Sequence, residues 1–110
     1  MIELDIHVQG RFTKFPGKEA VIDNLNHGKE VKLRVEKDCD GRIILVDRIT
    51  DEPAGCIPPN PSYLDKYEIL KTAVDKGFAR FVEVHAIEAC SKNKHYRVKI
   101  TIPYLEVTNV

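Results

Sequence analysis

The chain has 110 residues and a mass of 12.5 kDa, and 43% of its residues are apolar and 31% charged, the composition of one folded domain spanning residues 1–110. Its 17 basic and 17 acidic residues balance, which argues against a highly basic nucleic-acid packaging protein. Apolar runs such as 43–46 are too short to span a bilayer, and residues 1–6 contain acids where a signal peptide is basic. We therefore expect a cytoplasmic protein without a membrane span.

The first part of the chain predicts one strand and one short helix. Apolar and polar residues alternate over residues 2–9, the period of a strand with one solvent-exposed face, and Gly10 ends it. Residues 19–25 place apolar side chains at helical spacing before Asn26-His27-Gly28, which is typical of a helix C-terminus. We expect a short helix or turn there.

The middle of the chain predicts a hairpin. Residues 31–35 alternate and residues 43–46 form a more continuous apolar run, and the turn 38–41 between them contains Asp-Gly, which suits a hairpin. A brief apolar piece at 55–57 is followed by Pro58-Pro59-Asn60-Pro61, whose prolines lack the N–H groups of a strand ladder. A strand there is expected to be short or to lie at a sheet edge.

The second half predicts a helix and a long hairpin. Ser62, with an acidic residue three positions later, is typical of a helix N-cap, and an apolar stripe follows until Gly77. Residues 78–89 and 95–107 are rich in β-forming residues and are joined by a turn at 91–94. The complete order predicts a mostly antiparallel α+β fold, with about six strands in a small barrel-like sheet of the OB or SH3 kind, one main helix and one short helix.

The sequence lacks the common motifs of nucleotide-dependent enzymes and hydrolases. It contains no G-x-x-x-x-G-K-[ST], G-x-G-x-x-G or G-x-S-x-G. The histidines are scattered, so a zinc site would have to be assembled entirely by the fold, and the cysteines include no C-x-x-C pair. We expect no metal, no cofactor and no enzymatic activity. The residues concerned are His7, His27, His85, His95, Cys39, Cys56 and Cys90.

Two weaker catalytic arrangements remain open. Glu83 and His85 share one face of a predicted strand and would form an acid–base pair if they lined a pocket, although a solvated pair is the commoner outcome. Cys90 would serve as a nucleophile with His85 or His95 as its base, since they lie near the same predicted hairpin. A structural role explains these residues better.

Two stretches, 10–18 and 90–99, contain basic residues and no acidic ones, and together they would form one basic face. Aromatic residues are interleaved with the cations, a pattern in which rings stack on bases and cations neutralise phosphates. The alternative is that the cations are merely solvated and the rings belong to the core. The first stretch has Arg11, Phe12, Lys14, Phe15 and Lys18, and the second has Lys92, Lys94, Tyr96, Arg97 and Lys99.

Four short motifs in order resemble the HIRAN domain, a small β-barrel module found alone in bacteria and phages and fused to the front of some Swi/Snf-type helicases. They are Val8-Gln9-Gly10, Val31-x-Leu33-x-x-Glu36, Cys39-Asp40-x-x-x-Ile44-x-Val46 and Ala54-Gly55-Cys56-Ile57-Pro58. The resemblance covers roughly residues 5–90. It implies a barrel similar to an oligonucleotide-binding fold that grips the free 3′ end of single-stranded DNA, with an aromatic stack and an aspartate at the terminal hydroxyl.

The resemblance also implies a set of site residues. Asp40 matches the family's aspartate, and Arg11 with Phe12 stands where an arginine–tyrosine pair follows the opening glycine. Cys39 stands where the family has a stacking tyrosine, so one platform for a terminal base is missing. We expect a non-enzymatic module that binds single-stranded DNA or DNA ends. Its candidate nucleic-acid-binding residues are Arg11, Phe12, Lys14, Asp40, Lys92, Lys94 and Arg97.

An alternative of a different class is a protein-interaction adaptor or small homodimer. An exposed sheet edge, or the long C-terminal hairpin, would pair with a partner strand in that case. Association that does not depend on salt would favour this alternative over nucleic-acid binding.

Overall fold

The computed structural model describes residues 2–9, 15–90 and 95–103, and within them six strands form a single sheet. The strands are β1 (Ile2–Gln9), β2 (Val31–Lys37), β3 (Ile43–Asp47), β4 (Pro53–Ile57), β5 (Glu83–Cys90) and β6 (His95–Ile102). The helices are α1 (Gly17–Asn26) and α2 (Leu64–Asp75), with short 3-10 turns η1 (Pro61–Tyr63) and η2 (Ala79–Phe81). None of the described helices is both long and apolar enough to cross a bilayer.

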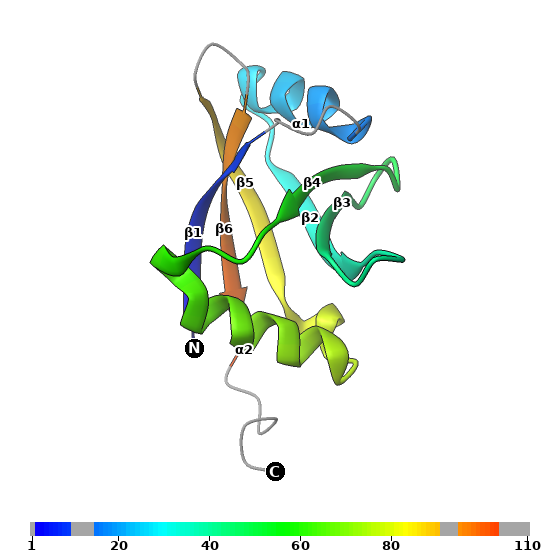
Figure 1. The fold of residues 1–110 in the computed structure, drawn as a ribbon. Helices are drawn as coiled ribbons and strands as arrows, with labels where there is room; N and C mark the ends of the chain where they lie inside the picture. The colour runs from blue at the N-terminus through cyan, green and yellow to red at the C-terminus, as the bar shows by residue number, and fades with distance from the viewer. Residues whose placement is uncertain (1, 10–14, 91–94, 104–110) are drawn as a thin grey trace.

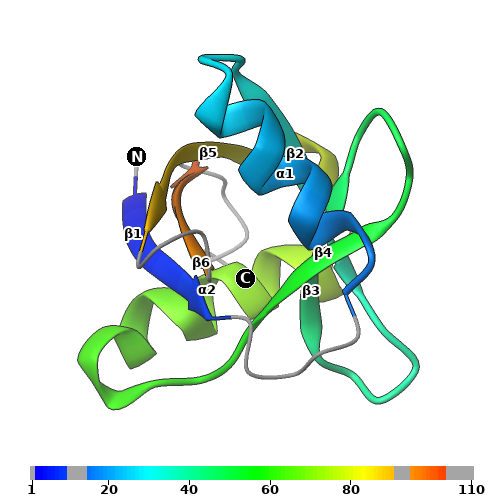
Figure 2. The same ribbon diagram turned by 90° about the horizontal axis from the view of Figure 1, so that it is seen from above.

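The sheet is antiparallel throughout and curls into a half-barrel (Figures 1 and 2). Its strand order is β1-β6-β5-β2-β3-β4, so β1 and β4 are the two edges. The curl brings these two edges close together. Gly55 in β4 lies so near Val8 in β1 that a Cβ added to the glycine would overlap Cγ1 of the valine. The predicted α+β fold with a curved, six-stranded antiparallel sheet is confirmed.

The core lies on the concave side of the sheet. Burial alternates along β1 and β6, as the period-two sequence pattern predicts, and each fully buried aliphatic side chain stabilises the fold by about 1.5–3 kcal/mol. The two helices cover the two ends of the half-barrel (Figure 1), with α1 packed on β4 and β5 and α2 on β1 and β2. Their buried side chains include Val21 and Ile22 from α1, and Tyr67, Leu70 and Ala73 from α2.

The start of α2 differs from the prediction. Ser62 is not the N-cap of the main helix. It lies within the 3-10 turn η1, and α2 begins after this turn, at Leu64. Asn60 caps that turn instead, and its Oδ1 accepts hydrogen bonds from the backbone N–H and the hydroxyl of Ser62, both at 2.9 Å. Pro61 explains the shift, because proline suits the first position of a helical turn and places the capping residue before it.

A β-bulge interrupts β5. Ala86 pairs with Val98, whereas Glu88 pairs with Arg97, so Ile87 is an extra residue in this strand. A bulge of this kind reverses which face the following residues occupy. Cys90 consequently pairs with His95 on the outer, convex face of the sheet, although the alternation set by Val84 and Ala86 would have turned it toward the core.

Candidate functional site

Five of the seven residues predicted to bind nucleic acid lie outside the described residues. Of the described residues that flank these stretches, Gln9 at the end of β1 pairs with His95 at the start of β6. The end of β1 and the start of β6 therefore lie at the same end of the sheet. The five residues are Arg11, Phe12, Lys14, Lys92 and Lys94.

Arg97, another predicted site residue, lies on the convex face of β6 between two acids. Its Nη1 is 3.0 Å from Oε1 of Glu88 in β5, and its Nε is 3.4 Å from Oδ1 of Asp5 in β1. The two carboxylates, one from β1 and one from β5, flank the guanidinium on β6 and neutralise its charge. Arg97 therefore contributes little net positive charge to this face.

Asp40, the seventh predicted residue, lies in the turn between β2 and β3. Its carboxylate is exposed and, among the described residues, forms a loose ion pair at 3.8 Å from Nη2 of Arg42. Strands β2 and β5 are antiparallel, and Lys37 at the end of β2 lies beyond the start of β5. Arg97 pairs with Glu88, which lies near the other end of β5. The fold thus places Asp40 and Arg97 at opposite ends of the sheet and does not join them in one site.

The turn that carries Asp40 is built by Asp38. Oδ1 of Asp38 accepts the backbone N–H groups of Asp40 at 2.9 Å and Arg42 at 2.8 Å, and Oδ2 accepts Nε of Arg42 at 2.8 Å. These donors, above all the Arg42 backbone N–H, hold the pKa of the Asp38 carboxyl below its ordinary value. Gly41 completes the turn with a φ of 80°, a conformation that favours glycine.

Tyr96, considered above as a ring that stacks on bases, is a core residue. Its side chain is fully buried and its hydroxyl donates a 2.8 Å hydrogen bond to the carbonyl oxygen of Ala54. Burial raises the pKa of this phenol far above its ordinary value. The alternation of β6 turns Tyr96 inward, so it cannot stack on a nucleic-acid base.

A cationic groove that the sequence patterns did not reveal lies on the convex face over the β2–β5 pair. It has a volume of about 510 Å³ and brings together three cations, Lys32, Arg48 and Arg80, with the ring of Phe81. Phe81 is 44% exposed, and the guanidinium carbon of Arg80 lies 4.8 Å from its ring centroid. The remaining lining residues are Leu33, Glu83, Val84 and His85.

The cations of this groove come from separate parts of the chain. Lys32 lies on β2, Arg48 follows β3 and Arg80 lies in η2, so no basic run marks them in the sequence. Arg48 is held in place because its Nε donates to the carbonyl oxygen of Leu33 at 3.3 Å. The one local signal was an aromatic residue directly after an arginine, Arg80-Phe81, in a segment that we expected to be part of a strand.

The predicted Glu83–His85 pair lies at this groove, but it is loose. Nε2 of His85 is 3.9 Å from Oε2 of Glu83, while Nδ1 is 3.1 Å from Oε1 of Glu30, an acid far from His85 in the sequence. Both carboxylates are mostly exposed. The imidazole is therefore shared between two hydrated acids, which is the arrangement of a surface ion-pair cluster.

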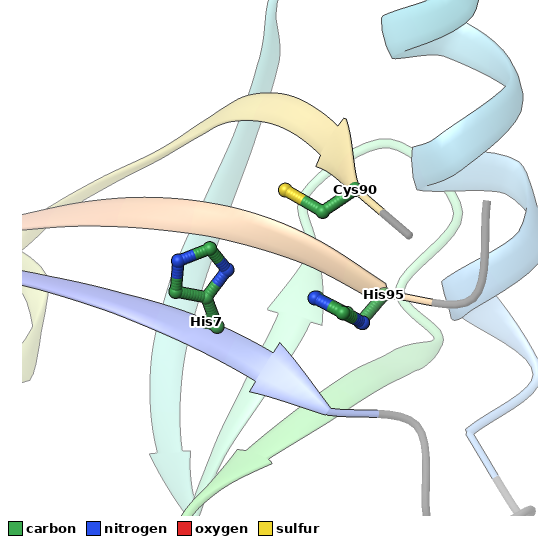
Figure 3. A group of neighbouring side chains, drawn as sticks. All are labelled: His7, Cys90 and His95. Carbon is green, nitrogen blue, oxygen red and sulfur yellow. The ribbon is translucent and has the colours of Figure 1, made fainter. Parts of the chain in front are cut away.

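Three further side chains meet at the end of the sheet where β1 and β5 end and β6 begins (Figure 3). One ligand atom from each of His7, Cys90 and His95 lies within 4.8 Å of the others. Cys90 lies beside His95, its partner in the β5–β6 register, whereas His85 pairs further along with Lys99. Of the two bases considered for a Cys90 nucleophile, only His95 is next to it.

No protein-family model, curated protein or solved structure matches the chain. The fold and the groove define its class in physical terms: a small α+β protein whose curled antiparallel sheet carries a cationic and aromatic groove on its convex face.

Proposed function

We propose that the protein is a non-enzymatic module that binds single-stranded nucleic acid, and single-stranded DNA in particular, through the groove over β2 and β5. The observation that carries this proposal is the gathering of Lys32, Arg48 and Arg80 around the exposed ring of Phe81. One acidic residue, Glu83, lines the same groove, so its side chains carry a net positive charge.

The combination of cations and one exposed ring suits a single strand better than a duplex. Each cation that neutralises a phosphate releases counterions, and an aromatic face stacks on an unpaired base without reading its identity. The Arg80 guanidinium lies over one face of the Phe81 ring, so a base would stack on the opposite face of the ring or on the guanidinium itself. In duplex DNA the base faces are already stacked, so Phe81 would have no base to contact.

The resemblance to HIRAN domains supports the choice of DNA and suggests recognition of a 3′ end. Asp40 supplies an exposed carboxylate at a hairpin tip, which suits a hydrogen bond from a terminal hydroxyl. Arg11, Phe12, Lys14, Lys92 and Lys94 remain candidate contacts on the same ground. Arg97 receives less support, because Asp5 and Glu88 already neutralise it.

The proposal is tested by titrating the protein into fluorescently labelled single-stranded DNA and following the anisotropy. The labelled strands carry a free 3′-hydroxyl, carry a blocked 3′ end, or are circular. If the protein binds all three strands and Arg80→Ala and Lys32→Ala weaken that binding, the result supports the groove as the binding site. If the protein prefers the free 3′ end and Asp40→Ala abolishes this preference, the result supports end recognition. Lys66→Ala is the matched control, since Lys66 is an exposed cation on α2, away from the groove. Unchanged binding by Arg80→Ala and Lys32→Ala would contradict the proposal.

A homodimer or adaptor that pairs through a sheet edge receives less support. The edge strand β4 is five residues long, begins at Pro53 and is followed by Pro58-Pro59, features that block strand addition. The other edge, β1, presents the acidic side chains of Glu3 and Asp5. Size-exclusion chromatography with light scattering separates the two candidates, since salt-insensitive dimerisation without DNA binding would favour the adaptor.

We also propose that the protein acts in the cytoplasm. All three cysteines are free thiols, which is consistent with a reducing compartment.

A further inference from the structure

We propose that His7, Cys90 and His95 form a binding site for a divalent transition metal of the zinc type on the convex face of the sheet. The three side chains come from three neighbouring strands, β1, β5 and β6, and point toward one another (Figure 3). One ligand atom from each residue lies within 4.8 Å of the other two. This cluster is separate from the cationic groove, whose lining includes none of the three residues.

The strand register explains why these three residues meet. Cys90 and His95 are direct partners across β5 and β6. His7 is the diagonal neighbour of His95 across β1 and β6, since His95 pairs with Gln9 and Arg97 pairs with His7. Directly paired and diagonal positions on one face are the two closest relationships that an antiparallel pair offers to long side chains.

The bulge at Ile87 is essential to the arrangement. Before the bulge, Val84 and Ala86 face the core, and an uninterrupted strand would turn Glu88 and Cys90 inward as well. The extra residue reverses the alternation and places the Cys90 thiol on the outer face with the two imidazoles. Bulges often redirect side chains next to functional sites, and here the redirected residue completes a ligand set.

Two imidazoles and one thiol are the donor types that zinc prefers. From typical Zn–N lengths of about 2.0–2.1 Å and a Zn–S length of about 2.3 Å, tetrahedral ligand atoms lie roughly 3.3–3.6 Å apart. Ligand atoms within 4.8 Å of one another reach that spacing by small side-chain rotations. His7 is exposed and Cys90 and His95 are half-buried, so close packing does not prevent those rotations.

Among the described residues of this face, the charges next to the cluster balance. The nearest residue row on this face holds Arg97, whose positive charge is balanced by Asp5 and Glu88. The His7 and His95 rings stand edge to face, with centroids 5.5 Å apart and an interplanar angle of 75°.

Three ligands from the described residues leave the fourth tetrahedral position open. Structural zinc sites in proteins are usually closed by four protein ligands, whereas sites with three keep a position for water or for an external ligand. The geometry therefore points to an open site at the surface of the sheet. Mg²⁺ and Ca²⁺ are not expected to bind there, since both require oxygen ligands.

The test uses Co²⁺ as a spectroscopic substitute for Zn²⁺. Metal-free, reduced protein is titrated with Co²⁺ while the visible ligand-field bands and the near-ultraviolet thiolate-to-cobalt charge-transfer band are followed. We expect saturation at one equivalent, an intensity typical of tetrahedral Co²⁺, and displacement of the cobalt by Zn²⁺. Mg²⁺ should not displace it.

Variants assign the ligands. Cys90→Ser should abolish the charge-transfer band, and His7→Ala and His95→Ala should each weaken Zn²⁺ binding about tenfold or more. Cys39→Ser and His27→Ala are matched controls, because Cys39 and His27 are exposed and lie outside the cluster, and both should bind Co²⁺ as the parent does. Far-ultraviolet circular dichroism checks that every variant is folded. The proposal is overturned if the parent takes up no stoichiometric Co²⁺, or if folded Cys90→Ser retains the charge-transfer band.

Discussion

The hydroxyl of Tyr96 in β6 donates a hydrogen bond to the carbonyl oxygen of Ala54 in β4, across 2.8 Å. In the strand order these two strands are separated by β5, β2 and β3, so the bond spans the open side of the half-barrel. Next to it, Gly55 lies against Val8 of β1. The curl of the sheet therefore depends on one buried polar contact and on one residue without a side chain.

Tyr96→Phe is expected to destabilise the protein. The change leaves the Ala54 carbonyl oxygen buried without its donor, which costs about 1–3 kcal/mol of unfolding free energy. Tyr63→Phe is the matched control: its hydroxyl donates to the carbonyl oxygen of Pro58 at 2.7 Å, but that bond is exposed to water. Urea denaturation of the two variants measures the difference. Equal losses would contradict a role for the Tyr96 bond in closing the sheet.

Gly55→Ala is expected to destabilise the protein by about 1–3 kcal/mol, because the new methyl group would overlap Val8. A Cβ at this position would lie 2.4 Å from Cγ1 of Val8 and 3.0 Å from the Tyr96 hydroxyl oxygen. The substitution should cost less in a Val8→Ala background, where the closest atom is removed. A double-mutant cycle by urea denaturation measures this coupling, and strictly additive costs would show that the overlap with Val8 is not the cause.

The stability contributed by Asp38 is expected to depend on pH. Its pKa is lower in the folded protein than in the unfolded chain, so the contribution is fully present above the ordinary carboxyl pKa of about 3.9 and is lost as the pH falls through the folded-state pKa. Asp38→Asn removes the charge, and its deficit relative to the parent should be largest near neutral pH and shrink in acid. Asp40→Asn, which removes a loose 3.8 Å ion pair with Arg42, is the control. Denaturant midpoints measured across the acid range test this, and a deficit that does not change with pH would refute it.

If the proposed function holds, Phe81 and Lys32 affect the proposed DNA binding in different ways. Phe81→Ala removes a stacking surface, so it should weaken binding by about 1–3 kcal/mol with little change in salt dependence. Lys32→Ala removes a phosphate contact, so it should reduce the slope of log K against log salt by about 0.7. Anisotropy titrations at several salt concentrations separate the two effects. Identical salt slopes for Lys32→Ala and the parent would remove Lys32 from the phosphate-binding surface.

Much of the fold was predictable because its information is local. The alternation in residues 2–9 predicted β1 at its observed bounds, and the Asp-Gly sequence predicted the β2–β3 turn that Asp38 and Gly41 form. The apolar run around residue 56 correctly predicted a short edge strand. The prediction at Ser62 was wrong, since Asn60, two residues earlier, supplies the capping oxygen.

The candidate sites were much less predictable, because each depends on contacts between distant residues. Lys32, Arg48 and Arg80 belong to three separate elements, and only the pairing of β2 with β5 places them around one groove. Four of the seven cations in the basic stretches, Arg11, Lys14, Lys92 and Lys94, lie outside the described residues. Arg97 proves to be neutralised by neighbouring acids.

The sequence by itself determined which residues alternate, turn and cap, since these preferences act between near neighbours in the chain. Only the tertiary structure decided which alternating faces meet, because strand order and register are set by packing the core as a whole. A single inserted residue, Ile87, shows the difference: it leaves the β-forming pattern of its segment intact, yet it moves Cys90 from the inner to the outer face and next to His95. The proposed metal site depends on that strand register, which no local sequence pattern predicts.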